Sequence, residues 1–99
     1  MVKWSVPARN DLKQIHDYIA KDSKYYARAV IQDIVAKTGT LADFPEIGRV
    51  VPEISNQNIR ELIVYSYRLV YEISAGEIEI LAIIHGRRDF ESAWDIRDR

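Results

Sequence analysis

Three stretches in the second half of the chain alternate between apolar and polar residues on the two-residue period of a β-strand. They are Ile59–Tyr65, Tyr67–Ser74 and Glu77–His85. The connection between the last two stretches is short and polar and contains Gly76, which favours the tight turn of a β-hairpin. The pattern therefore predicts three consecutive strands, of which the last two form a hairpin.

The same alternation assigns side chains to the two faces of the predicted sheet. One face of the second strand carries Tyr67, Leu69, Tyr71 and Ile73, and one face of the third carries Ile78, Ile80, Ala82 and Ile84. The opposite faces carry Arg68 and His85, and Arg60 lies in the first strand. Because the apolar face is buried, we expect Arg68, His85 and Arg60 to project together from the remaining face.

The first half of the chain changes from a strand period to a helix period. Val2–Val6 alternates as a short strand, and Pro7 suits the first turn of a helix, where its missing N–H costs nothing. An apolar stripe at helical spacing then follows, formed by Ala8, Leu12, Ile15 and Ile19. Ser23 is a good N-cap for a second helix that runs to about Ala42. The short connection predicts an antiparallel helix hairpin.

The order of these elements predicts the fold class. Pro45–Gln57 is expected to be a loop, and Phe90–Arg99 a polar tail of one or two helical turns anchored by Trp94. We therefore expect one α+β domain over residues 1–99, with residues 89–99 as a C-terminal tail. Its order is β-α-α-β-β-β, and its helix hairpin covers one face of a four-stranded, mainly antiparallel sheet. The other face is expected to stay open.

Composition narrows the possible functions. The chain has 99 residues, 47% hydrophobic and 29% charged, as in an ordinary globular domain. The absence of cysteine excludes a disulfide framework. No apolar run is long enough to span a membrane, and no export signal opens the sequence, so we expect a cytoplasmic protein without a membrane partner. A net charge of −1 argues against non-specific coating of nucleic acid.

Five motifs appear in a fixed order along the chain. They are Val6-Pro7-Ala8 with the first helix, Leu41–Arg49, Ile59-Arg60-Glu61-Leu62, Tyr67-Arg68-Leu69-Val70-Tyr71 and Ile83–Asp89. Together they resemble the RelE/ParE toxins of bacterial type II toxin–antitoxin, or plasmid stabilisation, modules. The resemblance covers nearly the whole chain. It implies a toxin that inhibits growth and is neutralised by a cognate antitoxin in a hetero-oligomer.

The resemblance leaves the mechanism of toxicity open. ParE-like members inhibit DNA gyrase by binding, whereas RelE-like members cut messenger RNA on the ribosome without a metal. The Phe44–Arg49 and Ile84–Asp89 segments look more like the ParE branch, so gyrase inhibition is favoured. The strand around Arg68 also occurs in the nuclease branch, where its arginine belongs to the active site. A non-toxic relative that only binds a partner is a third possibility.

The alternative enzyme, a metal-independent endoribonuclease, requires a base, a cation and an acid around the scissile phosphate. Arg68 and Arg60 are the candidate cations, His85 is a candidate acid or base, and Glu53 is a weaker candidate base. Each also has an ordinary interpretation, as a solvated charge or a structural hydrogen-bonding group. The absence of lysine between Thr38 and Arg99 argues against RNA cleavage of the RelE kind.

The candidate binding residues for an antitoxin or target are arginines. We expect the carboxylates of an acidic and apolar antitoxin segment to pair with Arg60, Arg68, Arg87 and Arg88. Operator DNA is expected to be contacted only through the antitoxin, as the resemblance implies. No nucleotide-binding glycine motif is present, and the two histidines are far apart in sequence, so we expect no cofactor and no metal.

Overall fold

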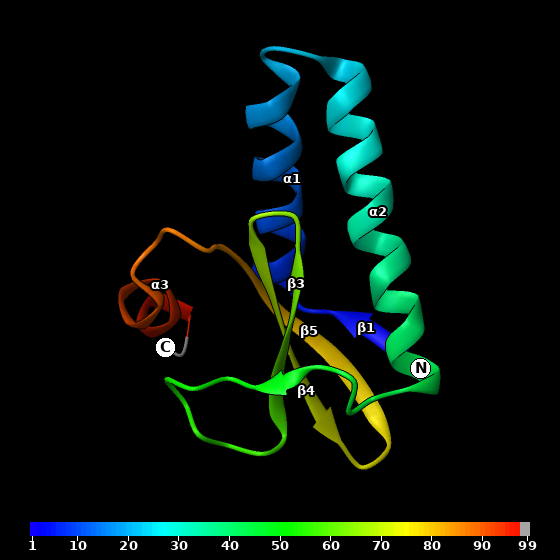
Figure 1. The fold of residues 1–99 in the computed structure, drawn as a ribbon, viewed down its shortest axis with the longest axis vertical. Helices are drawn as coiled ribbons and strands as arrows, with labels where there is room; N and C mark the ends of the chain where they lie inside the picture. Colours follow the sequence, from blue (N-terminus) through cyan, green and yellow to red (C-terminus); the bar gives the residue numbers. More distant parts are fainter. Residues whose placement is uncertain (98–99) are drawn as a thin grey trace.

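A five-stranded sheet, a helix hairpin and a short C-terminal helix make up the computed structural model, which describes residues 1–97 (Figure 1). The strands are β1 (Val2–Trp4), β2 (Arg49–Val50), β3 (Ile59–Val64), β4 (Tyr67–Ser74) and β5 (Glu77–His85), and the helices are α1 (Val6–Ala20), α2 (Lys24–Asp43) and α3 (Phe90–Arg97). The strand order is β1-β5-β4-β3-β2, with β1 parallel to β5 and the other neighbours antiparallel. Within these residues no helix is both long and apolar enough to cross a membrane.

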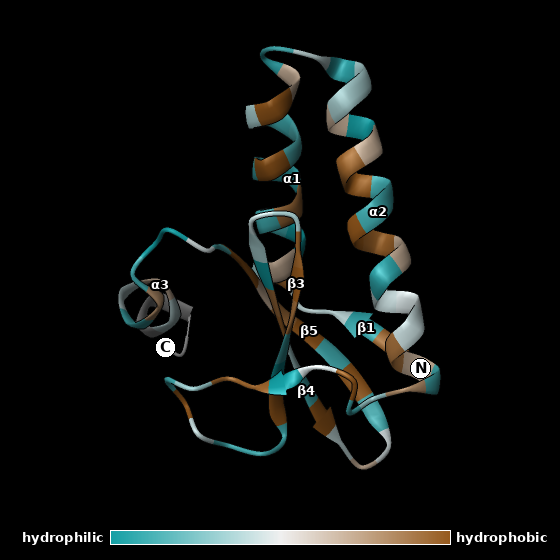
Figure 2. Ribbon diagram, viewed as in Figure 1, coloured by the Kyte–Doolittle hydropathy of each residue, from teal (hydrophilic) through white to brown (hydrophobic). Residues whose placement is uncertain are grey.

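The α1–α2 hairpin begins each helix with a serine cap. The Ser5 hydroxyl accepts from the Ala8 N–H at 3.1 Å, and the Ser23 hydroxyl accepts from the Tyr26 N–H at 3.0 Å, as expected for Ser23. The hairpin buries its apolar stripe against one face of the sheet, which we call the helix face. Its buried residues are Ala8, Ile15, Val30, Ile34 and Leu41, and the connection between the helices is hydrophilic (Figure 2).

The predicted order of elements is confirmed, with one strand missed. The predicted bounds of β4 and β5 are those observed, and β3 ends one residue earlier than expected. The first strand stops at Trp4 because Ser5 already caps α1. Within the predicted loop, Arg49 and Val50 form β2 by pairing with Glu61 and Arg60. The sheet therefore has five strands and not four, since a two-residue strand is too short to show an alternating pattern.

A β-bulge in β5 changes which residues share a face. Val70 lies opposite Ala82 and Tyr71 lies opposite Ile80, so Leu81 is an extra residue on β5. Ile78 and Ile80 pack with the helix hairpin, whereas Ala82 and Ile84 belong to a second core on the other face of the sheet. The prediction that these four residues share one face is therefore wrong.

The second face of the sheet is not open, which corrects another expectation. Val70, Ala82 and Ile84 project from it and are almost fully buried. Phe90 and Ala93 of α3 cover them, together with Val51 at the start of the loop after β2, and this cluster forms the second core. We call this side of the sheet the α3 face. The predicted tail thus contains the expected helical turns, and it also shields apolar surface that would otherwise meet water.

The start of α1 closes the part of β5 that extends beyond β1. The Ser5 N–H donates to the Ile80 carbonyl at 2.9 Å, and the Ser5 hydroxyl donates to the Leu81 carbonyl at 3.3 Å. The buried carboxylate of Asp11 accepts from the Ile83 N–H at 2.9 Å. These contacts satisfy backbone groups that a sheet edge would otherwise leave unpaired.

Tyr71 fastens the segment between α2 and β2 to the centre of the sheet. Its hydroxyl donates to the Pro45 carbonyl at 2.6 Å and accepts from the Gly48 N–H at 3.0 Å. A Cβ at Gly48 would lie 2.6 Å from the Glu61 carbonyl oxygen and 2.7 Å from the Tyr71 hydroxyl oxygen. Only glycine fits at position 48, so the Leu41–Arg49 motif that contains it has a structural role.

We predict opposite effects for alanine at two glycines. Gly48→Ala should destabilise the fold by about 1–3 kcal/mol, because the added methyl group must displace sheet backbone and the Tyr71 ring. Gly39→Ala is the matched control, since nothing lies within 4 Å of its Cβ position in α2. It should stabilise the protein by roughly 0.5–1 kcal/mol. Urea unfolding of both variants checks this, and a neutral Gly48→Ala would contradict it.

Candidate functional site

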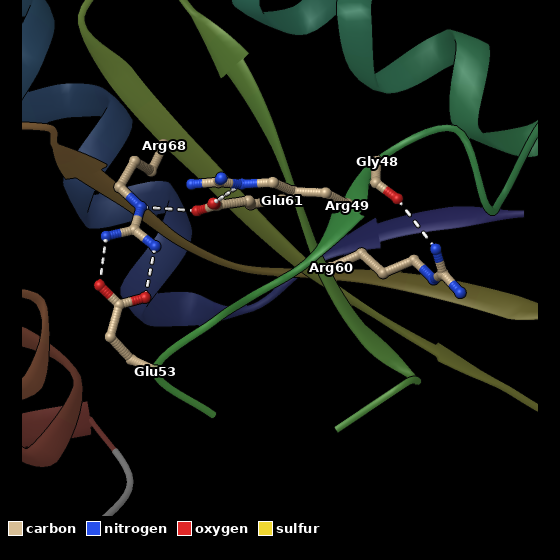
Figure 3. Close-up of polar contacts among 6 residues, drawn as sticks. All are labelled: Gly48, Arg49, Glu53, Arg60, Glu61 and Arg68. Carbon is tan, nitrogen blue, oxygen red and sulfur yellow. Dashed lines mark hydrogen bonds and ion pairs between the residues drawn. The ribbon is translucent and has the colours of Figure 1, made fainter. Parts of the chain in front are cut away.

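Charged residues from three strands and one loop meet on the α3 face of the sheet. Arg68 lies opposite Ile63, and Glu61 lies opposite Val70, so both side chains project from this face. Arg49 of β2 lies directly opposite Glu61 and projects on the same side. Glu53 reaches the group from the loop between β2 and β3 (Figure 3). We call these four residues the Arg68 network.

Glu61 is the centre of this network. Its side chain is fully buried, and its two carboxylate oxygens accept from the Nε atoms of Arg49 and Arg68, each at 2.6 Å (Figure 3). A buried carboxylate is costly unless charged donors surround it, and here two guanidinium groups do so. Glu61 therefore determines where both arginines lie.

Arg68 is held on every polar side of its guanidinium group. Its Nη1 and Nη2 atoms donate to the two carboxylate oxygens of Glu53 at 3.0 and 2.7 Å, in addition to the bond from Nε to Glu61. The Phe90 ring centroid lies 4.4 Å from its Cζ atom, within cation–π distance. Only 13% of the side chain is exposed. A second anion would therefore have to displace one of the carboxylates.

The hydrogen bonds between Arg68 and Glu53 shift the pKa values of both residues. The hydrogen bonds from Arg68 hold the pKa of Glu53 below its usual value, against a smaller opposing effect of burial. The hydrogen bonds to Glu53, and to a smaller extent the one to Glu61, raise the pKa of Arg68 above its usual value. Two arginines and two glutamates make the Arg68 network neutral overall, so it presents no net positive charge to a nucleic acid.

Arg60 lies on the other side of the sheet from the Arg68 network. It is opposite Tyr71, on the helix face. Its Nη1 donates to the Gly48 carbonyl at 3.0 Å (Figure 3). Its Nε donates to the Gln57 carbonyl, also at 3.0 Å. Arg60 thus secures the two ends of the segment that contains β2. We expected Arg60 to project beside Arg68, and this expectation is wrong.

His85 is also on the helix face and not beside Arg68. It pairs with Tyr67, whereas Arg68 pairs with Ile84, so the two side chains point to opposite sides of the sheet. The Tyr67 and His85 rings meet edge to face at 5.3 Å, and His85 Nδ1 accepts from the Arg87 N–H at 3.1 Å. The predicted cluster of Arg68, His85 and Arg60 is therefore wrong. The bulge at Leu81 reverses the alternation of β5 and moves His85 to the helix face, and Arg60 is on that face because it lies opposite Tyr71.

Arg87 and Arg88 follow His85 in an exposed turn. Among the side chains that the structure describes, those of residues 1–94, neither takes part in an ion pair. Arg88 lines a cleft of about 430 Å³ between α1 and the ends of β4 and β5, together with His85, Tyr18 and Tyr67. Tyr65, at the end of β3, donates its hydroxyl hydrogen to Asp33 of α2. Among the residues that the structure describes, no three His, Cys, Asp or Glu side chains are grouped so that they could hold a metal ion.

The sequence reading missed Glu61, Arg49 and Phe90 as members of this site. A signal for Glu61 was present, because it occupies an otherwise apolar alternating position in β3, where a carboxylate requires a charged partner. Arg49 and Phe90 carried no comparable signal, since each approaches the network only through tertiary packing. Glu53 and Arg68 were both found, as a base and a cation, but not as a pair.

Comparison with known proteins identifies the class. The model of the ParE toxin family of type II toxin–antitoxin systems (parDE) matches residues 2–90. The chain therefore belongs to the ParE toxin family. A search of curated proteins finds no significant match. A solved structure described as the chromosomal ParDE TA system from P. aeruginosa is similar, with a TM-score of 0.71 and 26% identity over 85% of this chain and 92% of that chain.

We predict a pH-dependent contribution of Glu53 to stability. Because its pKa is lowered in the folded state, its contribution is complete above the usual value of 4.5 and is lost as the pH falls through the lower folded value. Glu53→Gln should be less stable than the wild type at pH 7, by up to about 1 kcal/mol, since the pair is partly exposed.

The difference in unfolding free energy between Glu53→Gln and the wild type should shrink towards zero near pH 3. Urea unfolding at both pH values measures it, with Glu77→Gln at the exposed start of β5 as the control. A difference that stays constant with pH would contradict the assignment.

Proposed function

We propose that this protein is a growth-inhibiting toxin that acts by binding a protein target, DNA gyrase, and not by cleaving RNA. The main support is the arrangement of the candidate catalytic residues. Metal-independent cleavage needs a free cation beside an acid and a base. Each guanidinium nitrogen of Arg68 donates to Glu53 or Glu61, and His85 lies on the opposite face of the sheet. The groups of a nuclease are present but not assembled.

Exposed apolar surface also favours a protein target. The α1–α2 hairpin extends beyond the sheet (Figure 1), and three tyrosines lie around its free end. Tyr18 is 71% exposed, Tyr25 82% and Tyr26 51%. Exposed tyrosines are enriched in protein interfaces, where the ring contributes area and the hydroxyl a hydrogen bond. We propose this end of the hairpin as a contact for the target.

A cytoplasmic antitoxin is the second partner that we propose, forming a hetero-oligomer that reaches operator DNA only through the antitoxin. The similar solved structure is described as a ParDE system, and this chain offers a groove of about 500 Å³ between α2 and β3. Its lining includes Ala36, Ile63 and Tyr65. Apolar residues of an antitoxin segment would occupy this groove.

The outer edge of β3 offers backbone hydrogen bonds to the same segment. The Ile59 carbonyl accepts from the Val51 N–H, which shows that odd-numbered residues of β3 direct their backbone groups outward. Pairing with β2 ends at Glu61, so the outward groups of Ile63 have no strand partner within the described residues. An extended antitoxin segment could add there as a strand.

Toxicity should survive the loss of the His85 imidazole. We expect His85→Gln to arrest growth on induction as the wild type does, with intact transcripts and altered plasmid supercoiling, because no proton transfer is required. His16→Gln on α1 is the control. Parallel measurement of RNA integrity and plasmid topology after induction checks this.

Two results would contradict that proposal. Rapid transcript cleavage by the wild type, abolished in His85→Gln, would favour the RelE-like nuclease. Induction of the wild type without any growth defect would favour a non-toxic relative that only binds its partner.

Antitoxin binding should depend on Arg87 and Arg88, which make no ion pair with any side chain that the structure describes. Arg87→Gln with Arg88→Gln should weaken binding about three- to tenfold at low salt, since exposed charge pairs contribute roughly 0.2–1 kcal/mol each. The loss should diminish as salt is raised. Calorimetric titration with the antitoxin measures it, and Lys3→Gln in β1, which lies beside the start of β5 and far from Arg87 along that strand, is the control. Equal affinity of the double variant and the wild type at low salt would contradict the role.

A further inference from the structure

We propose that Arg68 and Arg49 form a binding site for a phosphate-type oxyanion, and that Glu53 is a built-in occupant that keeps this site closed. The inference does not depend on which target the toxin binds. It follows from three features of the Arg68 network. The guanidinium group of Arg68 is held in place by residues other than Glu53, and the Glu53 side chain can move away. Without Glu53, the remaining residues of the network carry a net positive charge.

The guanidinium group of Arg68 is positioned by residues other than Glu53. Glu61, with no exposed side-chain surface, holds its Nε at 2.6 Å, and Phe90, only 4% exposed, packs over its Cζ. Both partners belong to regular elements, β3 and α3. The two remaining donors, Nη1 and Nη2, are the pair that faces Glu53. A planar fork of this kind fits a phosphate as well as a carboxylate.

Glu53 is the member of the network that can move. It lies between β2 and β3 in a loop whose neighbouring residues, Pro52 and Ser55–Asn58, are exposed. Its side chain is 30% exposed, whereas that of Glu61 is not exposed at all. The backbone bonds of the loop start involve Val51, which accepts from Ile54 and Ser55. Withdrawal of the Glu53 side chain therefore breaks no strand pairing.

The charges that remain favour an anion with several oxygens. Without Glu53, two arginines share the single negative charge of Glu61, so the site carries one net positive charge. Arg49 uses its Nε for Glu61, and its side chain is 64% exposed. Both guanidinium groups then lie next to the same carboxylate with terminal N–H groups available. A tetrahedral oxyanion has more acceptor oxygens than a carboxylate, so it can accept from the terminal N–H groups of both arginines at once.

Inorganic phosphate is the probe for this site. We expect Glu53→Gln to bind phosphate about tenfold more tightly than the wild type, because it keeps the side-chain size and removes the competing charge. NMR of the arginine Nε–Hε signals should show phosphate-dependent shifts for Arg68. Glu77→Gln, which removes an exposed carboxylate elsewhere, should bind phosphate no better than the wild type.

Further variants separate this proposal from a general change in charge. Arg68→Gln added to Glu53→Gln should abolish the gain in phosphate binding. Glu53→Asp, whose carboxylate is one methylene shorter, should bind phosphate with intermediate affinity, and it also tests the proposal if Glu53→Gln does not fold. Acetate at equal concentration should bind Glu53→Gln more weakly than phosphate does.

The proposal is overturned if folded Glu53→Gln binds phosphate no better than the wild type, or if the gain persists without Arg68. Acetate binding as tight as phosphate would reject the tetrahedral ligand. These readouts use no growth assay, so a failure here is distinct from a failure of the proposed toxin function.

Discussion

The structure around the candidate site depends on one buried carboxylate. Glu61 has no exposed side-chain surface, and its desolvation is offset by charged donors from Arg49 and Arg68. Through these contacts it joins β2, β3 and β4, and through Arg68 it also reaches Glu53 in the loop and Phe90 in α3. Loss of this charge would leave two arginines without their shared partner on a largely apolar face of the sheet.

Some residues of the motifs that resemble toxins stabilise the fold. The segment before β2 resembles a toxin motif, yet Gly48 is required because Tyr71 and the β3 backbone leave no room for a side chain. Arg60 closes the same segment through backbone carbonyls. Motif residues in a small domain can thus serve its stability, whereas the exposed Arg87 and Arg88 make no ion pair with the described side chains and can bind a partner.

Arg68 occupies a position typical of a nuclease, yet the proposed function is binding of a protein target. The two are compatible because Glu53 and Glu61 neutralise the charge of Arg68. An arginine alone on a strand suggests a phosphate ligand, whereas an arginine between two carboxylates is electrostatically satisfied. The Glu53 carboxylate is what separates these two states. A change of one loop residue would therefore alter the anion-binding character of the surface without a change in the fold.

Local pattern was enough to determine the helices, the three long strands and the Ser23 cap, because periodicity and capping are properties of neighbouring residues. It also identified Arg68, Glu53 and the exposed Arg87 and Arg88 as candidates. Only the tertiary structure decided which side chains meet. The bulge at Leu81 moved His85 away from Arg68, and pairing with β3 turned Arg49 towards Glu61. A single extra residue reverses every later side chain in a strand, and that reversal follows from strand pairing and not from the composition of the strand.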